Sequence, residues 1–406
     1  MRKLKAQYIF DGTQLHKLAT LVVNERNEIE TILHNETTET AGEEFYNGIL
    51  CPGFVNAHCH LELSHYKNHI PQHGTLPEFI KNVVSLRNSL SGEIEAMQAA
   101  DKEMQQNGIV AVADISNTGI SFATKQQSPL YYHTFIELLD LFNTNSQEFE
   151  RGKALFSSHF HTMPLSLTPH APYSCSRKLI ERIAAHATEY EYPLSIHNQE
   201  CEAENEMYHS NSGVLHEQIF ADKTNTSTGS TSSLTTGSAT NKRPFFKYGK
   251  SSLQTYSTWL PQNSHIVLVH NVHTSQADID FLKNNCPDLQ YTFVLCPKSN
   301  AYIAQEIPPL DLFLKNKLNV AIGTDSLASN PELNIVSELF ALQQAFPGIS
   351  LAQLLTCATA NGARALGIQR QFGSFEKGKM PAVNLLECID FANMKLRENT
   401  TVRRVL

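Results

Sequence analysis

The sequence lacks several patterns that would assign it to common protein classes. Its eight cysteines form no CxxC pair, so neither a zinc knuckle nor a thioredoxin-like motif is present, and the thiols are typical of a reducing cytosol. No GxGxxG sequence follows an early strand, which counts against dinucleotide binding. No stretch approaches the ~18 apolar residues of a membrane span, and the basic N-terminus has no apolar core of signal-peptide length. We therefore expect a cytoplasmic protein with no membrane contact.

Charge is also scarce. Charged residues make up 18% of the 406 residues, and the formal net charge is −8. This balance provides no electrostatic reason to expect nucleic acid or an anionic membrane as a partner. We expect a small molecule as the partner, and a homo-oligomer remains compatible with the composition. The length is sufficient for one large domain and a smaller one.

The middle of the chain alternates between apolar, strand-like runs and amphipathic stretches. Runs such as "GIVAVADI", "YPLSIHN", "HIVLVHN" and "NVAIGTD" are separated by stretches such as "SRKLIERIAAHATEY". This alternation predicts an α/β protein with a parallel sheet, either closed as a (β/α)₈ barrel or open and doubly wound. Both ends of the chain contain short strands and turns instead. We expect a small β-domain built from residues 1–50 and 372–406, and a barrel over residues 51–371.

One segment does not fit this alternation. Residues 222–243, "DKTNTSTGSTSSLTTGSATNKR", are rich in Ser, Thr and Gly and contain almost no apolar side chains. Such a segment cannot bury much surface, so it is predicted to be a mobile loop. A tolerated surface insertion is favoured over a functional lid.

Two histidines follow the apolar run "ILCPGFV". In "VNAHCHLELS", residues 55–64, His58 and His60 are separated by one residue, so in a strand both would project to the same face. Paired imidazoles suit a transition metal, although an isolated HxH is weak evidence. Three later runs also end in polar residues: His197 followed by Glu200, His270, and Asp325. Because the carboxyl ends of barrel strands converge on one face, the pattern predicts a shared metal site there.

These residues belong to a set of motifs that resembles the amidohydrolase superfamily, and within it the purine-type deaminases. The motifs are "PGFVNAHCH", "TPHAPYSC", "SIHNQE", "VLVHNV", "LCPKSNAYIA" and "GTDSLASNPELN", which occur in the family's order. The resemblance implies a (β/α)₈ barrel with one divalent ion, zinc or alternatively iron, and a substrate contact at His170. It also implies four metal ligands: His58, His60, His197 and Asp325. The fourth strand region, "HTMPLSLTPHAPY", has no lysine to bridge two metals, which favours a single ion. The C-terminal "MPAVNLL" departs from the family's acidic "DADLV", away from the site.

The same residues suggest a division of chemical roles. A metal lowers the pKa of water from ~15.7 toward ~7, and Asp325 is the expected base for the water proton. Glu200 is the expected acid for a ring nitrogen, because a carboxyl group in a dry pocket can stay protonated. His270 would orient the water or stabilise the tetrahedral adduct. Glu62 is a candidate substrate contact, with a purely structural role as an equal alternative.

The function predicted from the resemblance is hydrolytic deamination of an aminopurine nucleoside. Aminodeoxyfutalosine is the first candidate substrate, followed by S-adenosylhomocysteine, 5′-methylthioadenosine and adenosine. The alternative is another amidohydrolase reaction on a cyclic amide, an imidazolone, guanine or a pterin ring, and an inactive metal-binding barrel is a more distant one. The choice of aminodeoxyfutalosine as first candidate rests partly on "GTLPEFIKNVV", where Thr75, Pro77 and Glu78 predict a helix start. Phe79 and Val83 would face the barrel or an apolar part of the substrate.

Overall fold

Eight parallel strands form the centre of the computed structural model, which describes residues 1–406 except 35–41, 87–88, 144 and 221–248. They form two four-stranded sheets, in the orders β6-β7-β8-β9 and β10-β11-β12-β13. Nearly every residue of these strands is buried, as expected when both faces of a parallel sheet are covered. Their bounds are β6 Phe54–Cys59, β7 Ile109–Ser116, β8 Tyr131–Leu138, β9 Leu165–Pro169, β10 Leu194–Asn198, β11 His265–His270, β12 Gln290–Leu295 and β13 Val320–Ile322.

The two sheets join at both edges into a closed barrel. At one junction the Ser195 amide donates to Oγ1 of Thr168 at 2.7 Å, between β9 and β10. At the other, the amides of Thr324 and Asp325 both donate to the carbonyl oxygen of His58 at 3.1 Å. The carboxyl ends of β6 and β13 therefore lie side by side. The expected (β/α)₈ barrel is confirmed, and the open alternative is wrong.

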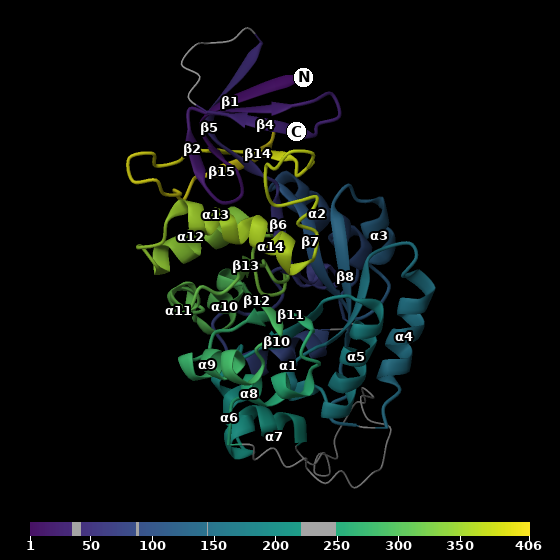
Figure 1. Cartoon of the computed structure of the whole chain (residues 1–406). Helices are drawn as coiled ribbons and strands as arrows, with labels where there is room; N and C mark the ends of the chain where they lie inside the picture. Colours follow the sequence, from purple (N-terminus) through teal and green to yellow (C-terminus); the bar gives the residue numbers. More distant parts are fainter. Residues whose placement is uncertain (35–41, 87–88, 144, 221–248) are drawn as a thin grey trace.

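Helices surround the barrel (Figure 1). Their bounds are α1 Leu76–Leu86, α2 Glu93–Gln106, α3 Phe122–Gln127, α4 Glu148–His159, α5 Arg177–Tyr190, α6 Glu202–Ser210, α7 Val214–Phe220, α8 Ser252–Tyr256, α9 Gln276–Asn285, α10 Pro297–Ala304, α11 Leu310–Lys315, α12 Ile335–Ala345, α13 Leu351–Ala358 and α14 Ala360–Ala365. In the described residues, no helix is long and apolar enough to cross a membrane.

The predicted start of α1 is confirmed. The Glu78 amide donates to Oγ1 of Thr75 at 3.4 Å, and Glu78 Oε2 accepts from the Thr75 amide at 2.9 Å, which forms a capping box. Phe79 and Val83 pack against the buried cluster that contains Tyr66. This packing is the ordinary helix contact with the body of the protein, and a contact of either side chain with the substrate stays a prediction.

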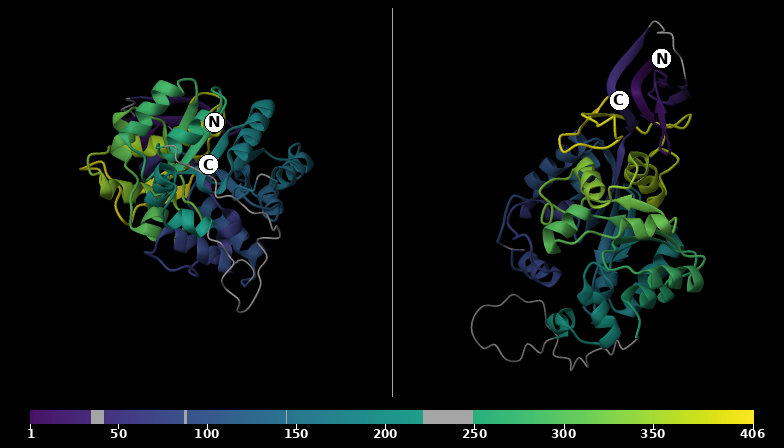
Figure 2. Two further views of the ribbon diagram at one scale, coloured as in Figure 1. Left: turned by 90° about the horizontal axis from the view of Figure 1, so that it is seen from below. Right: turned by 90° about the vertical axis from the view of Figure 1, so that its left-hand side faces the viewer.

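Strands from both ends of the chain share one sheet, in the order β15-β14-β5-β1-β3-β4, with β2 paired to β1. Strand β14 pairs with β5 in antiparallel register, which ties the two ends of the chain together. Figures 1 and 2 place this sheet at one end of the molecule, with both chain termini beside it. The division at residues 50 and 372 stays a prediction, and segment 222–243 lies outside the described residues. The bounds are β1 Arg2–Phe10, β2 Leu15–Lys17, β3 Thr20–Val23, β4 Ile29–Leu33, β5 Glu43–Pro52, β14 Val383–Glu387 and β15 Thr401–Arg404.

Candidate metal centre

The predicted metal ligands converge at the carboxyl ends of the barrel strands. His58 is in β6 and His60 directly follows that strand, His197 is in β10, and Asp325 lies three residues after β13. The Nε2 atom of His60 lies 3.1 Å from Nε2 of His58 and 3.2 Å from Nε2 of His197. Oδ1 of Asp325 lies 3.7 Å from His58 Nε2 and 3.6 Å from His60 Nε2. All four side chains are buried.

This arrangement fits a single divalent ion. Two ligand atoms at ~2.1 Å from one ion are separated by about 3.0–3.4 Å for bond angles of about 90–110°. The histidine nitrogens lie within that range, and Asp325 corresponds to a somewhat wider angle. Three Nε2 atoms that face one another cannot all form hydrogen bonds, because a neutral imidazole has one donor and one acceptor. An ion accounts for lone pairs that would otherwise oppose each other.

The far side of His197 is held by a backbone carbonyl. Its Nδ1 donates to the carbonyl oxygen of His170 at 2.8 Å, which leaves Nε2 with a lone pair directed at the cluster. Burial lowers the pKa of His197 to about 4, with a further contribution from His170. Burial also lowers the pKa of His60 well below its usual value. Both rings are therefore in the neutral form that a metal requires.

Asp325 is oriented by two serine hydroxyls from different elements. Ser299 in α10 and Ser329 donate to its Oδ2 at 2.6 and 2.7 Å, so Oδ1 is left facing the histidines. The backbone of Asp325 has φ of +57°, in the left-handed region that residues other than glycine seldom adopt. Such a conformation persists only where the surroundings hold it, as the paired amides of Thr324 and Asp325 on the His58 carbonyl do here.

Glu200 and His270 lie beside the four ligands. Nε2 of His270 is 3.6 Å from Oε1 of Glu200, and both side chains are buried. Burial raises the pKa of Glu200 well above its usual range, and the charges of Asp325 and Glu204 add to that effect. Burial also lowers the pKa of His270 to about 3. Burial therefore favours a protonated carboxyl group at Glu200 and a neutral imidazole at His270 beside the cluster.

The predicted contact Glu62 binds the loop that follows β7. Its carboxylate accepts from the amides of Asn117 and Thr118 at 3.1 Å, and from the Thr118 hydroxyl at 3.0 Å. Burial raises its pKa. Because both oxygens anchor the loop after β7, these contacts favour the structural alternative for Glu62. His170 lies next to His197, with ring centroids 4.9 Å apart.

Sequence reasoning missed three groups at this face of the barrel. Glu137, the penultimate residue of β8, lies 3.6 Å from Nδ1 of His197. Asp114 in β7 and Lys125 in α3 form a fully buried ion pair at 2.5 Å. Asp114 also accepts from the amide of Leu61 at 2.7 Å, immediately after His60. The acids could have been found from their positions near the ends of the apolar runs "GIVAVADI" and "YYHTFIELL".

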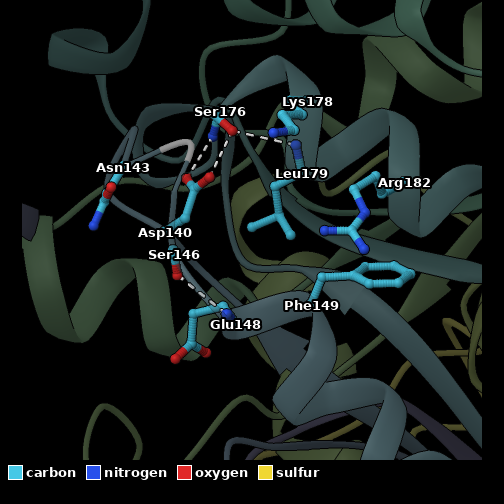
Figure 3. Close-up of a pocket in the computed structure, with 9 residues that line it drawn as sticks. All are labelled: Asp140, Asn143, Ser146, Glu148, Phe149, Ser176, Lys178, Leu179 and Arg182. Atoms are coloured by element: carbon cyan, nitrogen blue, oxygen red, sulfur yellow. Dashed lines mark hydrogen bonds between the residues drawn. The ribbon is translucent and has the colours of Figure 1, made fainter.

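A separate pocket lies outside the barrel. It is lined by residues of α4, α5 and the loops before them, including Asp140, Ser176 and Arg182 (Figure 3). Asp140 accepts from the amide and hydroxyl of Ser176 there, at 2.7 and 2.5 Å, and so holds the start of α5. None of its lining residues belongs to the histidine cluster.

A closed β/α barrel with histidines and an aspartate at the carboxyl ends of its strands is the architecture of metal-dependent barrel hydrolases. The chain belongs to the Amidohydrolase family, whose model matches residues 49–403.

Curated relatives and solved structures narrow the comparison. A 5′-deoxyadenosine deaminase from Methanococcus vannielii is 25% identical over 93% of this chain and 81% of its own. A 5-methylthioadenosine/S-adenosylhomocysteine deaminase from Thermoanaerobacter pseudethanolicus is 25% identical over 84% of this chain and 73% of its own. The crystal structure of Helicobacter pylori aminofutalosine deaminase with methylthio-coformycin superposes with a TM-score of 0.78 at 21% identity, covering 95% of this chain and 92% of that one. This structural similarity is evidence for the fold alone.

Proposed function

We propose that this protein is a metal-dependent hydrolytic deaminase of aminopurine nucleosides, which releases ammonia and leaves a carbonyl group on the ring. The observation that carries the proposal is the position of Glu200 and His270 directly beside the four-residue cluster, 3.6 Å from each other. Deamination needs an acid for the ring nitrogen and a polar group near the attacked carbon. Both are present at the same end of the barrel, and the two deaminase relatives align over most of the chain.

His58, His60, His197 and Asp325 would hold the ion. The donor set of three imidazoles and one carboxylate suits zinc, with iron as the alternative. When bound, the ion supplies hydroxide near neutral pH by making water more acidic. The fourth barrel strand, β9, has the sequence "LSLTP" without lysine, which supports one ion per chain.

Asp325 is suited to accept the proton of the attacking water. Its Oδ2 is already committed to Ser299 and Ser329, so Oδ1 is the oxygen available on the histidine side. Holding one carboxylate oxygen in this way orients the base without using the oxygen that reacts. His270 adjoins the same space, and a neutral ring there can donate a hydrogen bond to charge that develops on the attacking oxygen.

Glu200 is suited to donate a proton to the ring nitrogen next to the attacked carbon. Burial raises its pKa well above the usual range, which favours the protonated form, because burial disfavours the carboxylate. The ionised Glu200 can then pass the proton of the added hydroxyl group to the departing amine, so that the nitrogen leaves as ammonia and the ring keeps the oxygen as a carbonyl group. The first water proton, which Asp325 accepted, then passes to Glu200, and both carboxyl groups return to their starting states.

The substrate class is narrower than the reaction. Aminodeoxyfutalosine is the first candidate, then S-adenosylhomocysteine, 5′-methylthioadenosine, 5′-deoxyadenosine and adenosine, all of which carry the reactive amine on the same purine ring. The sequence resemblance at "HCHLELS" and at the start of α1 supports this order. Guanine and pterins share an amidine-like reacting group but lack the sugar.

The test is an ammonia-release screen with metal-replete protein over those nucleosides, guanine, adenine and a pterin. We expect one of the nucleosides to have the highest kcat/KM. If a free base or a pterin exceeds every nucleoside by tenfold, equivalent to ~1.4 kcal/mol of transition-state binding, the nucleoside assignment is wrong. Hydrolysis of a cyclic amide without ammonia release would overturn deamination itself. Elemental analysis of the same purified protein distinguishes zinc from iron.

A further inference from the structure

Glu137 is a buried acid that neither the fold nor the proposed chemistry uses completely. It is 3% exposed, at the carboxyl end of β8. Its Oε2 accepts from Nδ2 of Asn117 at 2.8 Å, and Asn117 is itself held through its amide by Glu62. The carboxyl group therefore has a fixed orientation, and one of its oxygens is accounted for.

The other oxygen, Oε1, has no hydrogen-bond partner among the described residues. Nδ1 of His197 lies 3.6 Å from it, but the proton on that nitrogen already goes to the carbonyl of His170 at 2.8 Å. A buried acceptor without a donor is destabilising, so an orphan oxygen in a native site calls for a partner that the protein itself does not provide.

A second acceptor lies next to it. A carboxylate oxygen of Glu137 and a ring nitrogen of His170 lie within 4.8 Å of each other. The Ser174 hydroxyl donates to the carbonyl of Ala171, so it accepts the Nδ1 proton of His170 across 2.7 Å. Nε2 of His170 is then left with a lone pair. The two side chains together present acceptors, and a ligand that fits them must bring donors.

The position of Glu137 and His170 determines which part of the substrate these two side chains can contact. His270 is in β11, and Glu200 and Asp325 follow β10 and β13, whereas Glu137 is in β8 and His170 directly follows the neighbouring strand β9. His197 separates the two groups, with ring centroids 5.5 Å from His270 and 4.9 Å from His170. The pair thus faces a part of the substrate away from the reacting carbon.

In an N6-amino purine nucleoside, the ring nitrogens away from the reacting edge are acceptors, and the donors are the hydroxyls of the sugar. We infer that Glu137, together with His170, binds the adjacent 2′ and 3′ hydroxyl groups of the ribose. This inference rests on the proposed function and assigns the sugar-recognising residue of that site. It explains why the carboxyl group is held rigidly through one oxygen while the other stays open.

The test compares two matched substitutions, Glu137→Gln and Glu204→Gln. Glu204 is also a buried acid with one oxygen, Oε2, that lacks a partner among the described residues, and its Oε1 accepts from the Gln199 amide at 3.0 Å. In both variants, glutamine can keep the paired oxygen and place its amide nitrogen where the free oxygen was. Only at Glu137 does this change replace an acceptor beside His170 with a donor.

The readout is the preference of each protein for a ribonucleoside over its 2′,3′-dideoxy form, measured as a ratio of kcat/KM. The nucleoside is the one with the highest kcat/KM in the ammonia-release screen. We expect a preference of at least tenfold in the wild type, a loss of about 10- to 100-fold of that preference in Glu137→Gln, and less than threefold change in Glu204→Gln. Metal content should be equal in all three proteins. Calorimetric binding of the 6-oxo product nucleoside and its dideoxy form should show the same ratios without turnover.

Three results would overturn the inference. A wild type that does not distinguish the ribonucleoside from the dideoxy form excludes it without any variant. A preference that survives Glu137→Gln removes that residue from sugar recognition, while the deaminase activity stands. If the wild type deaminates no nucleoside in the screen, the proposed function fails, and this inference fails with it.

Discussion

The Oγ atom of Ser299 lies 2.6 Å from Oδ2 of Asp325, although Ser299 is in α10 and Asp325 lies in the connection after β13. Ser329 donates to the same oxygen at 2.7 Å. Both hydroxyls hold the carboxylate in one orientation, so that Oδ1 faces His58 and His60. Mutation of contacts of this kind around a ligand typically costs about 10- to 100-fold in metal affinity or activity.

Removing these hydroxyls should weaken metal binding without unfolding the protein. We expect Ser299→Ala and Ser329→Ala each to lower metal affinity or activity by about 10- to 100-fold, because Asp325 loses a donor that orients it. Competition with a chelator measures the affinity. Ser264→Ala is the matched control, since this buried hydroxyl has no partner among the described residues. An unchanged affinity in both Asp325-neighbour variants would show that the serines merely fill space.

The metal ligands themselves make the simplest prediction. Purified protein should contain about one divalent ion per chain, and His58→Ala or His60→Ala should lose metal and activity together, because each removes one of four ligands. Elemental analysis measures the content. His69→Ala, at an exposed histidine of the same segment, is the control and should retain the metal. Two tightly bound ions per chain would contradict the single-ion site.

Glu200→Gln should separate metal binding from turnover. The amide cannot carry a proton, so we expect kcat to fall by ~10²–10⁴-fold while metal content stays the same. Glu202→Gln, in the same acidic run but exposed, is the control. Activity within a few-fold of wild type would remove Glu200 from proton transfer.

The buried ion pair of Lys125 and Asp114 should matter for stability. Lys125→Met leaves Asp114 charged in the core, so the free energy of unfolding should drop by ~3–5 kcal/mol in denaturant titrations. A further Asp114→Asn change removes that charge, keeps an acceptor for Leu61, and should recover part of the loss. Arg177→Met, which breaks the exposed pair with Glu181, should cost less than ~1 kcal/mol. Equal losses at the two sites would contradict this account.

Glu204 should contribute a pH dependence to stability. Burial is the main cause that raises its pKa to about 7 from a usual value of 4.5. The folded protein then holds a proton that the unfolded chain releases, so stability is greatest at low pH and declines as pH rises from about 4.5 to about 7. Relative to Glu204→Gln, which carries no such proton, the wild type should lose on the order of 3 kcal/mol across that window. Urea unfolding of both proteins at several pH values measures the difference, and parallel curves would refute it.

The parallel strands and the polar side chains at their ends could be predicted because both follow from local patterns, and the family resemblance added the closed barrel. Apolar runs of strand length alternate with amphipathic stretches, and His58, His60, His197, His270 and Asp325 each occur where a run ends. Since parallel strands of a barrel bring their carboxyl ends together, residues that end different strands are expected to be neighbours in space. The start of α1 was predictable for the same reason, because Thr75 and Glu78 are close in sequence.

The use of each carboxyl oxygen could not be predicted. Glu62 follows His60 by only two residues, so its sequence position suggests a role at the metal site. Its oxygens nevertheless accept hydrogen bonds from the loop at Asn117. Glu137 lies in a run that resembles an ordinary buried strand, yet one of its oxygens lacks a partner among the described residues. Both outcomes depend on residues more than fifteen positions away.

The sequence by itself determined the alternation of strands and helices and the set of side chains at the strand ends, because hydrophobic periodicity and strand length are local properties. Its resemblance to the amidohydrolases then implied that the sheet closes into a barrel. Only the tertiary structure decided which of those side chains face the histidines and which are consumed by neighbours. The physical reason is that hydrogen bonds are short-ranged: a carboxylate such as Asp325 or Glu137 is assigned its role by the donors within about 3 Å, and the fold brings those donors from other strands.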